Sequence, residues 1–203
     1  MIRVGLTGGI GSGKTTVCNH LDKRGAKVVY ADSLAKDLMQ SDPKLIQQIK
    51  DAFGDQAYLA DGTLNKDYLR REAFEKGEVE KLNRLVHPRV YEKIEEVMQQ
   101  AERQGYAIFV YESALLLQRR KLPENLDYLV LVDAPEELRA KRVAERDGTS
   151  VESVRQRMDK QPDFSKWRAS TDFLIENEAS PQKLIDQAEE LYQKLKKIDH
   201  ARN

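Results

Sequence analysis

Cysteine is nearly absent from this sequence. Its 203 residues include one cysteine, Cys18, which excludes an intrachain disulfide framework and a cysteine-rich zinc site. No apolar run approaches the roughly 20 residues that a membrane-spanning helix needs, and the mean hydropathy is -0.67. The first residues run straight into glycines without the shape of a secretory signal. We therefore expect a cytoplasmic protein with no membrane partner.

An excess of charge of one sign is also absent. The 34 Lys and Arg residues balance 34 Asp and Glu residues, and the formal net charge is zero. Proteins that bind nucleic acid through bulk positive charge are usually basic, so we expect no nucleic-acid partner. Repeats and proline-rich linkers are missing as well, which favours one domain over residues 1–203. No apolar helix face is left over for a partner, and we expect a monomer.

Five short apolar segments have the character of β-strands. They are residues 2–6, 27–30, 108–111, 128–132 and 173–175. Helical patterns separate them, which predicts an α/β fold with a five-stranded parallel sheet. We expect helices over residues 14–23 and from residue 181 to about residue 198, the last one packed on the sheet.

Residues 33–105 are far more than one crossover helix needs between the second and third strands. Asp42 and Pro43 predict the start of a helix that Gly54 ends. Residues 68–74 indicate another helix, and Pro88 is expected to open a long third one. We interpret residues 33–105 as a helical insertion between these two strands.

Residues 8–15, Gly-Gly-Ile-Gly-Ser-Gly-Lys-Thr, fit the phosphate-binding pattern G-x-x-x-x-G-K-[ST]. The glycines let successive backbone N–H groups face a phosphate, and the following helix adds its positive dipole end. In such loops the lysine bridges the β- and γ-phosphates of ATP and the hydroxyl ligates Mg²⁺. The alternative is a glycine-rich turn with an exposed lysine. The residues expected to bind the nucleotide are Gly9, Gly11, Ser12, Gly13, Lys14, Thr15 and Thr16, and Thr15 is also a metal ligand.

A cationic stretch follows the fourth strand. Between residues 139 and 168, nine basic residues face five acidic ones, a local balance of +4. Phosphoryl transfer needs cations around the migrating charge, so we interpret residues 147–168 as a lid that Asp147 and Gly148 hinge. Arg142 and Arg146 are the best catalytic candidates. The alternative is a solvated helix face in which Glu145 pairs with these arginines.

Two missing sequence motifs narrow the class of nucleotide-binding protein. The Asn-Lys-x-Asp pattern of guanine-specific switches and the signature of transporter ATPases are both missing. A kinase for a small acceptor remains. Asp32, just past the second strand, is either the base that accepts the acceptor's proton or the N-cap of a helix over residues 33–40.

Taken together, residues 6–16, 30–32, 85–90, 146–148 and 175–177 resemble the dephospho-coenzyme A kinase family over nearly the whole chain. The resemblance implies a three-layer P-loop fold like that of nucleoside monophosphate kinases. It also implies ATP-dependent phosphorylation of the ribose 3′-hydroxyl of dephospho-coenzyme A, with Asp32 as general base. The helical insertion over residues 33–105 would then bind the acceptor. Thr7, His87 and Arg89 would face it, the last two from the start of the long helix, unless they only cap that helix. Asn177 would lie near the adenine of ATP.

One segment departs from that family's pattern. Its members often follow the third strand with a Pro-Leu-Leu-Phe-Glu-like segment, whereas residues 112–118 here read Glu-Ser-Ala-Leu-Leu-Leu-Gln. Glu112 stands close to where P-loop enzymes place an acid, and we expect it to contact Mg²⁺ through water. Two rival functions remain: a nucleoside or nucleoside monophosphate kinase, and a slow regulatory switch.

Overall fold

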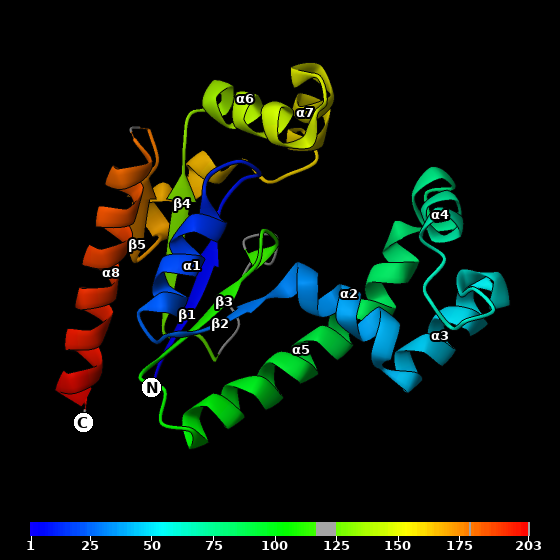
Figure 1. Cartoon of the computed structure of the whole chain (residues 1–203), viewed down its shortest axis with the longest axis horizontal. Helices are drawn as coiled ribbons and strands as arrows, with labels where there is room; N and C mark the ends of the chain where they lie inside the picture. The colour runs from blue at the N-terminus through cyan, green and yellow to red at the C-terminus, as the bar shows by residue number, and fades with distance from the viewer. Residues whose placement is uncertain (117–124, 179, 203) are drawn as a thin grey trace. The chain divides into compact units, whose positions relative to one another are not determined.

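The computed structural model of this chain describes residues 1–116, 125–178 and 180–202. The described residues contain five strands, which confirm the five predicted ones; four of them end one residue later than predicted (Figure 1). They are β1 (Ile2–Thr7), β2 (Lys27–Tyr30), β3 (Ile108–Glu112), β4 (Tyr128–Asp133) and β5 (Phe173–Glu176). Residues 117 and 118 of the atypical segment lie outside the described residues.

The strands form one sheet in the order β2-β3-β1-β4-β5. β1 lies at its centre and pairs in parallel with β3, Ile2 opposite Ile108, and with β4, Val4 opposite Tyr128. β4 and β5 also pair in parallel. Because parallel strands end at the same edge, the glycine loop after β1 lies beside the ends of β3, β4 and β5.

Two helices cover the sheet through apolar faces. α1 (Lys14–Lys23) packs against α8 (Pro181–Arg202), and α8 also contacts β1, β3 and β5 (Figure 1). α8 buries Leu184, Ala188, Leu191 and Leu195, which confirms its predicted packing. Cys18 is fully buried on α1, and burial raises the pKa of its thiol well above the usual range. Among the described residues, no helix is both long enough and apolar enough to cross a membrane.

The two helices that directly follow β4 pack against each other. α6 (Glu136–Asp147) ends at Gly148, whose φ of +61° is left-handed. α7 (Val151–Met158) begins after Ser150, whose side chain accepts a hydrogen bond from the backbone of Ser153 at 3.2 Å. The turn predicted at Asp147 and Gly148 is therefore present, and its role as a hinge stays a prediction. A 3-10 helix, η4 (Phe164–Ser170), leads into β5.

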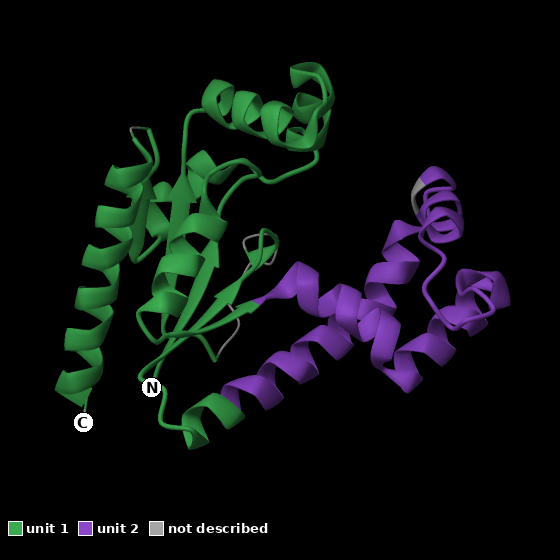
Figure 2. Ribbon diagram, in the orientation of Figure 1, with its two compact units in different colours: residues 1–29, 100–203 green, residues 30–99 purple. Residues whose placement is uncertain are grey.

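The chain divides into two compact units (Figure 2). Unit 1 comprises Met1–Val29 and Gln100–Asn203 and holds the sheet, while unit 2 is Tyr30–Gln99 and is helical. The helices that begin in unit 2 are α2 (Ala31–Ser41), α3 (Pro43–Phe53), η1 (Asp55–Ala57), α4 (Lys66–Leu69), the π-helix η2 (Arg70–Glu75) and α5 (Val79–Arg103).

The prediction that Pro88 opens the long helix is wrong. α5 begins at Val79 and runs through Pro88. An internal proline costs about 3 kcal/mol because it loses one backbone hydrogen bond and crowds the preceding turn. The buried residues Leu82, Val86, Val90 and Ile94 lie on both sides of Pro88. Full burial of each contributes about 1.5 to 3 kcal/mol, which exceeds the cost of the proline.

Asp42 joins two helices of unit 2. Its carboxylate accepts a hydrogen bond from the backbone N–H of Leu45 at 2.9 Å, which confirms it as the N-cap of α3. The same carboxylate accepts from the guanidinium of Arg89 on α5, with Nε at 3.2 Å. The bond from Arg89, followed by the one from Leu45, holds the pKa of Asp42 below its usual range.

We expect Asp42→Ala to lower the free energy of unfolding by about 1 kcal/mol for the lost cap alone. Losing the contact with Arg89 adds to this effect. Because the pKa of Asp42 is lowered in the folded chain, its stabilisation is present above the usual carboxyl pKa and disappears as the pH falls. Urea denaturation should show a difference from wild type at pH 7 that shrinks in acid.

Asp37→Ala is the matched control for this experiment, because Asp37 is an exposed aspartate on α2. It should leave the unfolding midpoint nearly unchanged at either pH. Equal losses in the two variants would show that Asp42 has no special structural role.

Candidate active site

The loop between β1 and α1 depends on glycine at two places above all. Gly8 and Gly13 have φ angles of +150° and +102°, which side-chain-bearing residues rarely adopt. A Cβ at Gly8 would lie 2.1 Å from the carbonyl oxygen of Val132, and one at Gly13 would lie 2.5 Å from Nδ2 of Asn177. The loop is therefore packed tightly between the end of β4 and the residue after β5.

Lys14 opens α1 and folds its side chain back over the loop. Its Nζ donates to the carbonyl oxygen of Gly8 at 2.9 Å and to that of Gly9 at 3.3 Å. It also lies 3.7 Å from the carboxylate of Glu112, the last residue of β3. The structure thus brings the predicted phosphate-binding cation and the predicted acid together at the carboxyl edge of the sheet.

Thr15 and Glu112 are suitable ligands for Mg²⁺. Thr15 lies in the first turn of α1 and is exposed, while the Glu112 side chain is 12% exposed beside Lys14. Hydroxyl and carboxylate oxygens are the donors this ion prefers, and it usually takes only one or two of them from the protein. The residues present therefore fit a magnesium ion that is shared with phosphate groups.

Two buried hydroxyls flank the loop. Thr7 and Ser12 are both 0% exposed, and Thr7 Oγ1 and Ser12 Oγ have no hydrogen-bond partner among the described residues. A buried hydroxyl normally has a partner, so both remain possible contacts for a ligand. Of the other predicted binding residues, Gly9 and Gly11 lie in the loop, and Thr16 is exposed in the first turn of α1.

Asn177 connects the loop with α6. It is 5% exposed, and its Nδ2 donates to the carbonyl oxygen of Ser12 at 2.8 Å. Arg142 donates to both Asn177 oxygens, to the backbone carbonyl and to Oδ1, at 3.3 Å each. Arg142 and Asn177, predicted from distant parts of the sequence, therefore meet beside the glycine loop.

Arg146 has a different environment. Its side chain is 63% exposed, and its Nε donates to Asp147 at 2.7 Å. Arg157 donates to the other oxygen of Asp147 at 2.8 Å. These two bonds, the one from Arg146 first, lower the pKa of Asp147 to about 2. The alternative interpretation paired Arg142 and Arg146 with Glu145, whereas the structure shows Arg142 bound to Asn177 and Arg146 bound to Asp147.

The remaining predicted residues belong to unit 2. Asp32 is exposed in the first turn of α2, whose N-cap is Tyr30, so the interpretation of Asp32 as an N-cap is wrong. His87 packs edge-on against Tyr91, with ring centroids 6.4 Å apart. Arg89 contacts Asp42 and Glu92. His87 and Arg89 lie well inside α5, not at its start, because that helix continues through Pro88.

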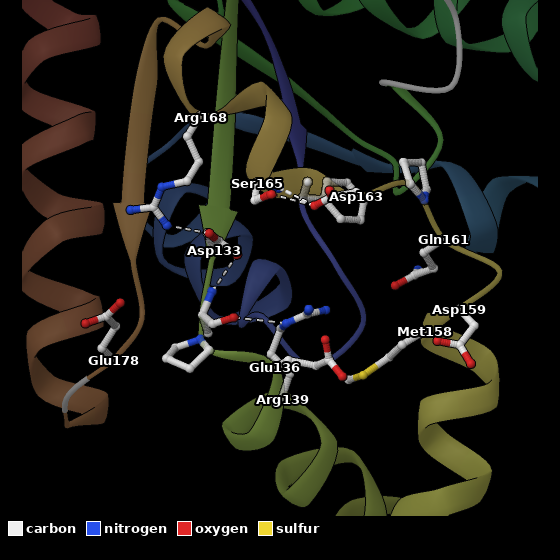
Figure 3. Close-up of a pocket in the computed structure, with 14 residues that line it drawn as sticks. Asp133, Glu136, Arg139, Met158, Asp159, Gln161, Asp163, Ser165, Arg168 and Glu178 are labelled. Carbon is white, nitrogen blue, oxygen red and sulfur yellow. Dashed lines mark hydrogen bonds and ion pairs between the residues drawn. The ribbon is translucent and has the colours of Figure 1, made fainter.

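A pocket of about 500 Å³ opens beside the end of β4 (Figure 3). Arg139 and Arg168 line it, together with Gln161. Arg168 binds Asp133 at 2.5 Å, and Gln161 accepts a hydrogen bond from the backbone N–H of Ile10 in the glycine loop at 2.8 Å. The sequence indicated Arg139 and Arg168 only as members of the cationic stretch, and Gln161 only as part of the lid. A further signal was the i, i+3 spacing of Arg139 and Arg142 on one helix.

Comparisons with known proteins agree with this geometry. The family model described as Dephospho-CoA kinase matches residues 2–183. A Dephospho-CoA kinase of Salinibacter ruber is 42% identical, covering 95% of this chain and 96% of that protein. One of Corynebacterium jeikeium is 36% identical, covering 93% and 97%. The solved structure of Dephospho-CoA kinase from Campylobacter jejuni aligns with a TM-score of 0.67 at 26% identity, over 96% of this chain and 97% of that one.

Proposed function

This chain belongs to the dephospho-CoA kinase family, and we propose that residues 8–15 hold ATP while Asp32 activates the acceptor. The reaction of the family is the last step of coenzyme A biosynthesis, in which ATP phosphorylates dephospho-coenzyme A. The observation that carries this function is the family match over residues 2–183, together with the glycine loop over which Lys14 folds.

In our mechanism the ribose 3′-hydroxyl oxygen attacks the γ-phosphorus of ATP in line. Asp32 accepts the hydroxyl proton, the bond between the γ-phosphorus and the β,γ-bridging oxygen breaks, and ADP leaves with that oxygen. Two observations support Asp32 as the general base: its side chain is exposed, and it is not the N-cap of α2.

The loop amides and Lys14 orient the β- and γ-phosphates, and Arg142 and Arg146 offset negative charge. Ser12, Gly13 and Asn177 form the wall of the nucleotide site, and Asn177 lies near the adenine. Thr15 and Glu112 are the residues that would hold Mg²⁺, which supplies charge neutralisation of the phosphates when bound.

The acceptor would contact Thr7, Asp32, His87 and Arg89. Arg89 already pairs with Asp42 and with Glu92, so its contact with the acceptor requires an N–H group that neither carboxylate takes. A guanidinium has five N–H donors, which makes such sharing possible. We infer that the enzyme works as a monomer in the cytoplasm, and analytical ultracentrifugation tests the first part of that inference.

An acceptor panel tests the function. ADP release from ATP should depend on dephospho-coenzyme A and should be near background with adenosine, with AMP and without acceptor. The product should carry a new 3′-phosphate, seen by mass spectrometry and phosphorus NMR. Preference for adenosine or AMP would instead identify a nucleoside or nucleotide kinase. Slow ADP release that no acceptor accelerates would identify a switch.

A further inference from the structure

We propose that Arg139 is a catalytic residue that contacts the terminal phosphate of ATP during transfer. It was not among the individual arginines that the sequence indicated. The inference rests on the proposed function and assigns one more residue to the same site.

The Arg139 side chain lies directly against the glycine loop. Its Nε donates to the carbonyl oxygen of Ala134 at 3.0 Å, which holds the side chain at the turn between β4 and α6 (Figure 3). Its NH1 donates to the carbonyl oxygen of Ile10 in the loop at 3.5 Å. A Cβ built on Gly9 would lie only 2.2 Å from NH1. The guanidinium therefore occupies the space that the missing side chain of Gly9 leaves open.

The charge of Arg139 is balanced differently from that of its half-buried neighbours. Arg155 contacts Glu137 at 2.5 Å, and Arg168 contacts Asp133 at 2.5 Å. Within the described parts of the chain, the hydrogen-bond partners of Arg139 are backbone carbonyl oxygens and no carboxylate forms an ion pair with it. A partly buried cation without a counter-ion, next to a loop that binds phosphates, favours an anion.

The lid contacts the same loop residue. Gln161 accepts from the N–H of Ile10 at 2.8 Å, while Arg139 donates to its carbonyl oxygen. The backbone N–H and the carbonyl oxygen of Ile10 are thus both hydrogen-bonded to side chains, one from the lid and one from α6. One turn further along α6, Arg142 is bound to Asn177. Arg139 is consequently the α6 arginine that lies on the loop itself.

Arg139→Met tests the proposal. We expect kcat to fall by about 100-fold, the usual effect of removing one group that stabilises developing charge. The KM for dephospho-coenzyme A should change little. Arg139→Lys should recover part of kcat because the charge remains. Guanidinium chloride at a non-denaturing concentration should partly restore Arg139→Ala, which a purely structural role would not allow.

Arg3→Met is the matched control, since Arg3 is a half-buried arginine near the start of β1, outside the lid, whose guanidinium pairs with Glu102 at 3.4 Å. It should retain kcat within about twofold. A wild-type enzyme inactive on dephospho-coenzyme A would overturn the proposed function. An active wild type with an equally active, folded Arg139→Met variant would overturn only the role of Arg139.

Gly9→Ala provides a test that leaves Arg139 chemically intact. The added methyl group would meet Arg139 and would be in ordinary contact with Phe164 at 3.5 Å, so it should displace only the guanidinium. We expect a lower kcat for Gly9→Ala alone and little further loss when it is added to Arg139→Met. Independent effects that multiply in the double variant would contradict the proposal.

Discussion

Asp32→Asn is expected to lower kcat by about a thousandfold while the affinity for ATP stays within about twofold of wild type. Positioned general bases contribute roughly 10² to 10⁴ in rate, and an amide of the same shape cannot accept the proton. Asp32 is exposed and caps no helix, so the stability of the fold should not change. Steady-state kinetics and calorimetric titration with ATP measure the two effects separately.

Asp37→Asn is the control for this substitution, because it makes the same chemical change at another exposed position of α2. It should keep nearly full activity. An Asp32→Asn enzyme with most of its kcat would show that another group accepts the proton. A large loss of kcat in both variants would show that the reaction needs the negative charge of α2 in general and not Asp32 in particular.

Lys14→Ala should reduce kcat/KM for ATP by more than about a thousandfold, a loss on the order of 4 kcal/mol of transition-state stabilisation. Lys14 is the side chain that folds over the loop carbonyls, where it can follow the phosphates through transfer. ATP binding itself should also weaken. The melting temperature should change little, although Glu112 loses a cationic neighbour.

Lys23→Ala removes an exposed lysine from the last turn of the same helix and is the appropriate control. Its kinetics should resemble those of wild type. If Lys14→Ala kept a tenth of the wild-type kcat/KM, the loop would bind something other than the reacting phosphates. Circular dichroism of both variants separates loss of chemistry from loss of fold.

Local sequence patterns were sufficient for the strands and for most helix ends. The strands are continuous apolar runs because a parallel sheet is covered on its faces, and β4 shows this with the consecutive residues Val130, Leu131 and Val132 all 0% exposed. Asp42 and Gly54 marked the two ends of α3. The Asp42 side chain accepts a backbone hydrogen bond in the first turn, and Gly54 adopts a positive φ after the last turn. Apolar runs and helix caps can be predicted from sequence because each depends only on residues close together in the chain.

Pro88 shows where local signals fail. A proline is most easily accommodated in the first helical turn, and the sequence offered no local reason to continue a helix through it. The reason is tertiary: apolar residues on both sides of Pro88 are buried in the same helix. Asp32 shows the same limit. Aspartate is a preferred N-cap residue, but α2 begins at Ala31, so Asp32 lies inside the first turn of the helix.

The sequence by itself determined the α/β sheet, the phosphate-binding loop and the family of this protein, because each depends on residue types at a fixed local spacing. Which arginine of α6 lies on the loop was decided only by the tertiary structure. Arg139, Arg142 and Arg146 are equivalent in composition, yet one lies on Gly9, one binds Asn177 and one pairs with Asp147 at the surface. The direction of a helix face relative to a loop more than 100 residues away depends on packing, which local spacing does not specify.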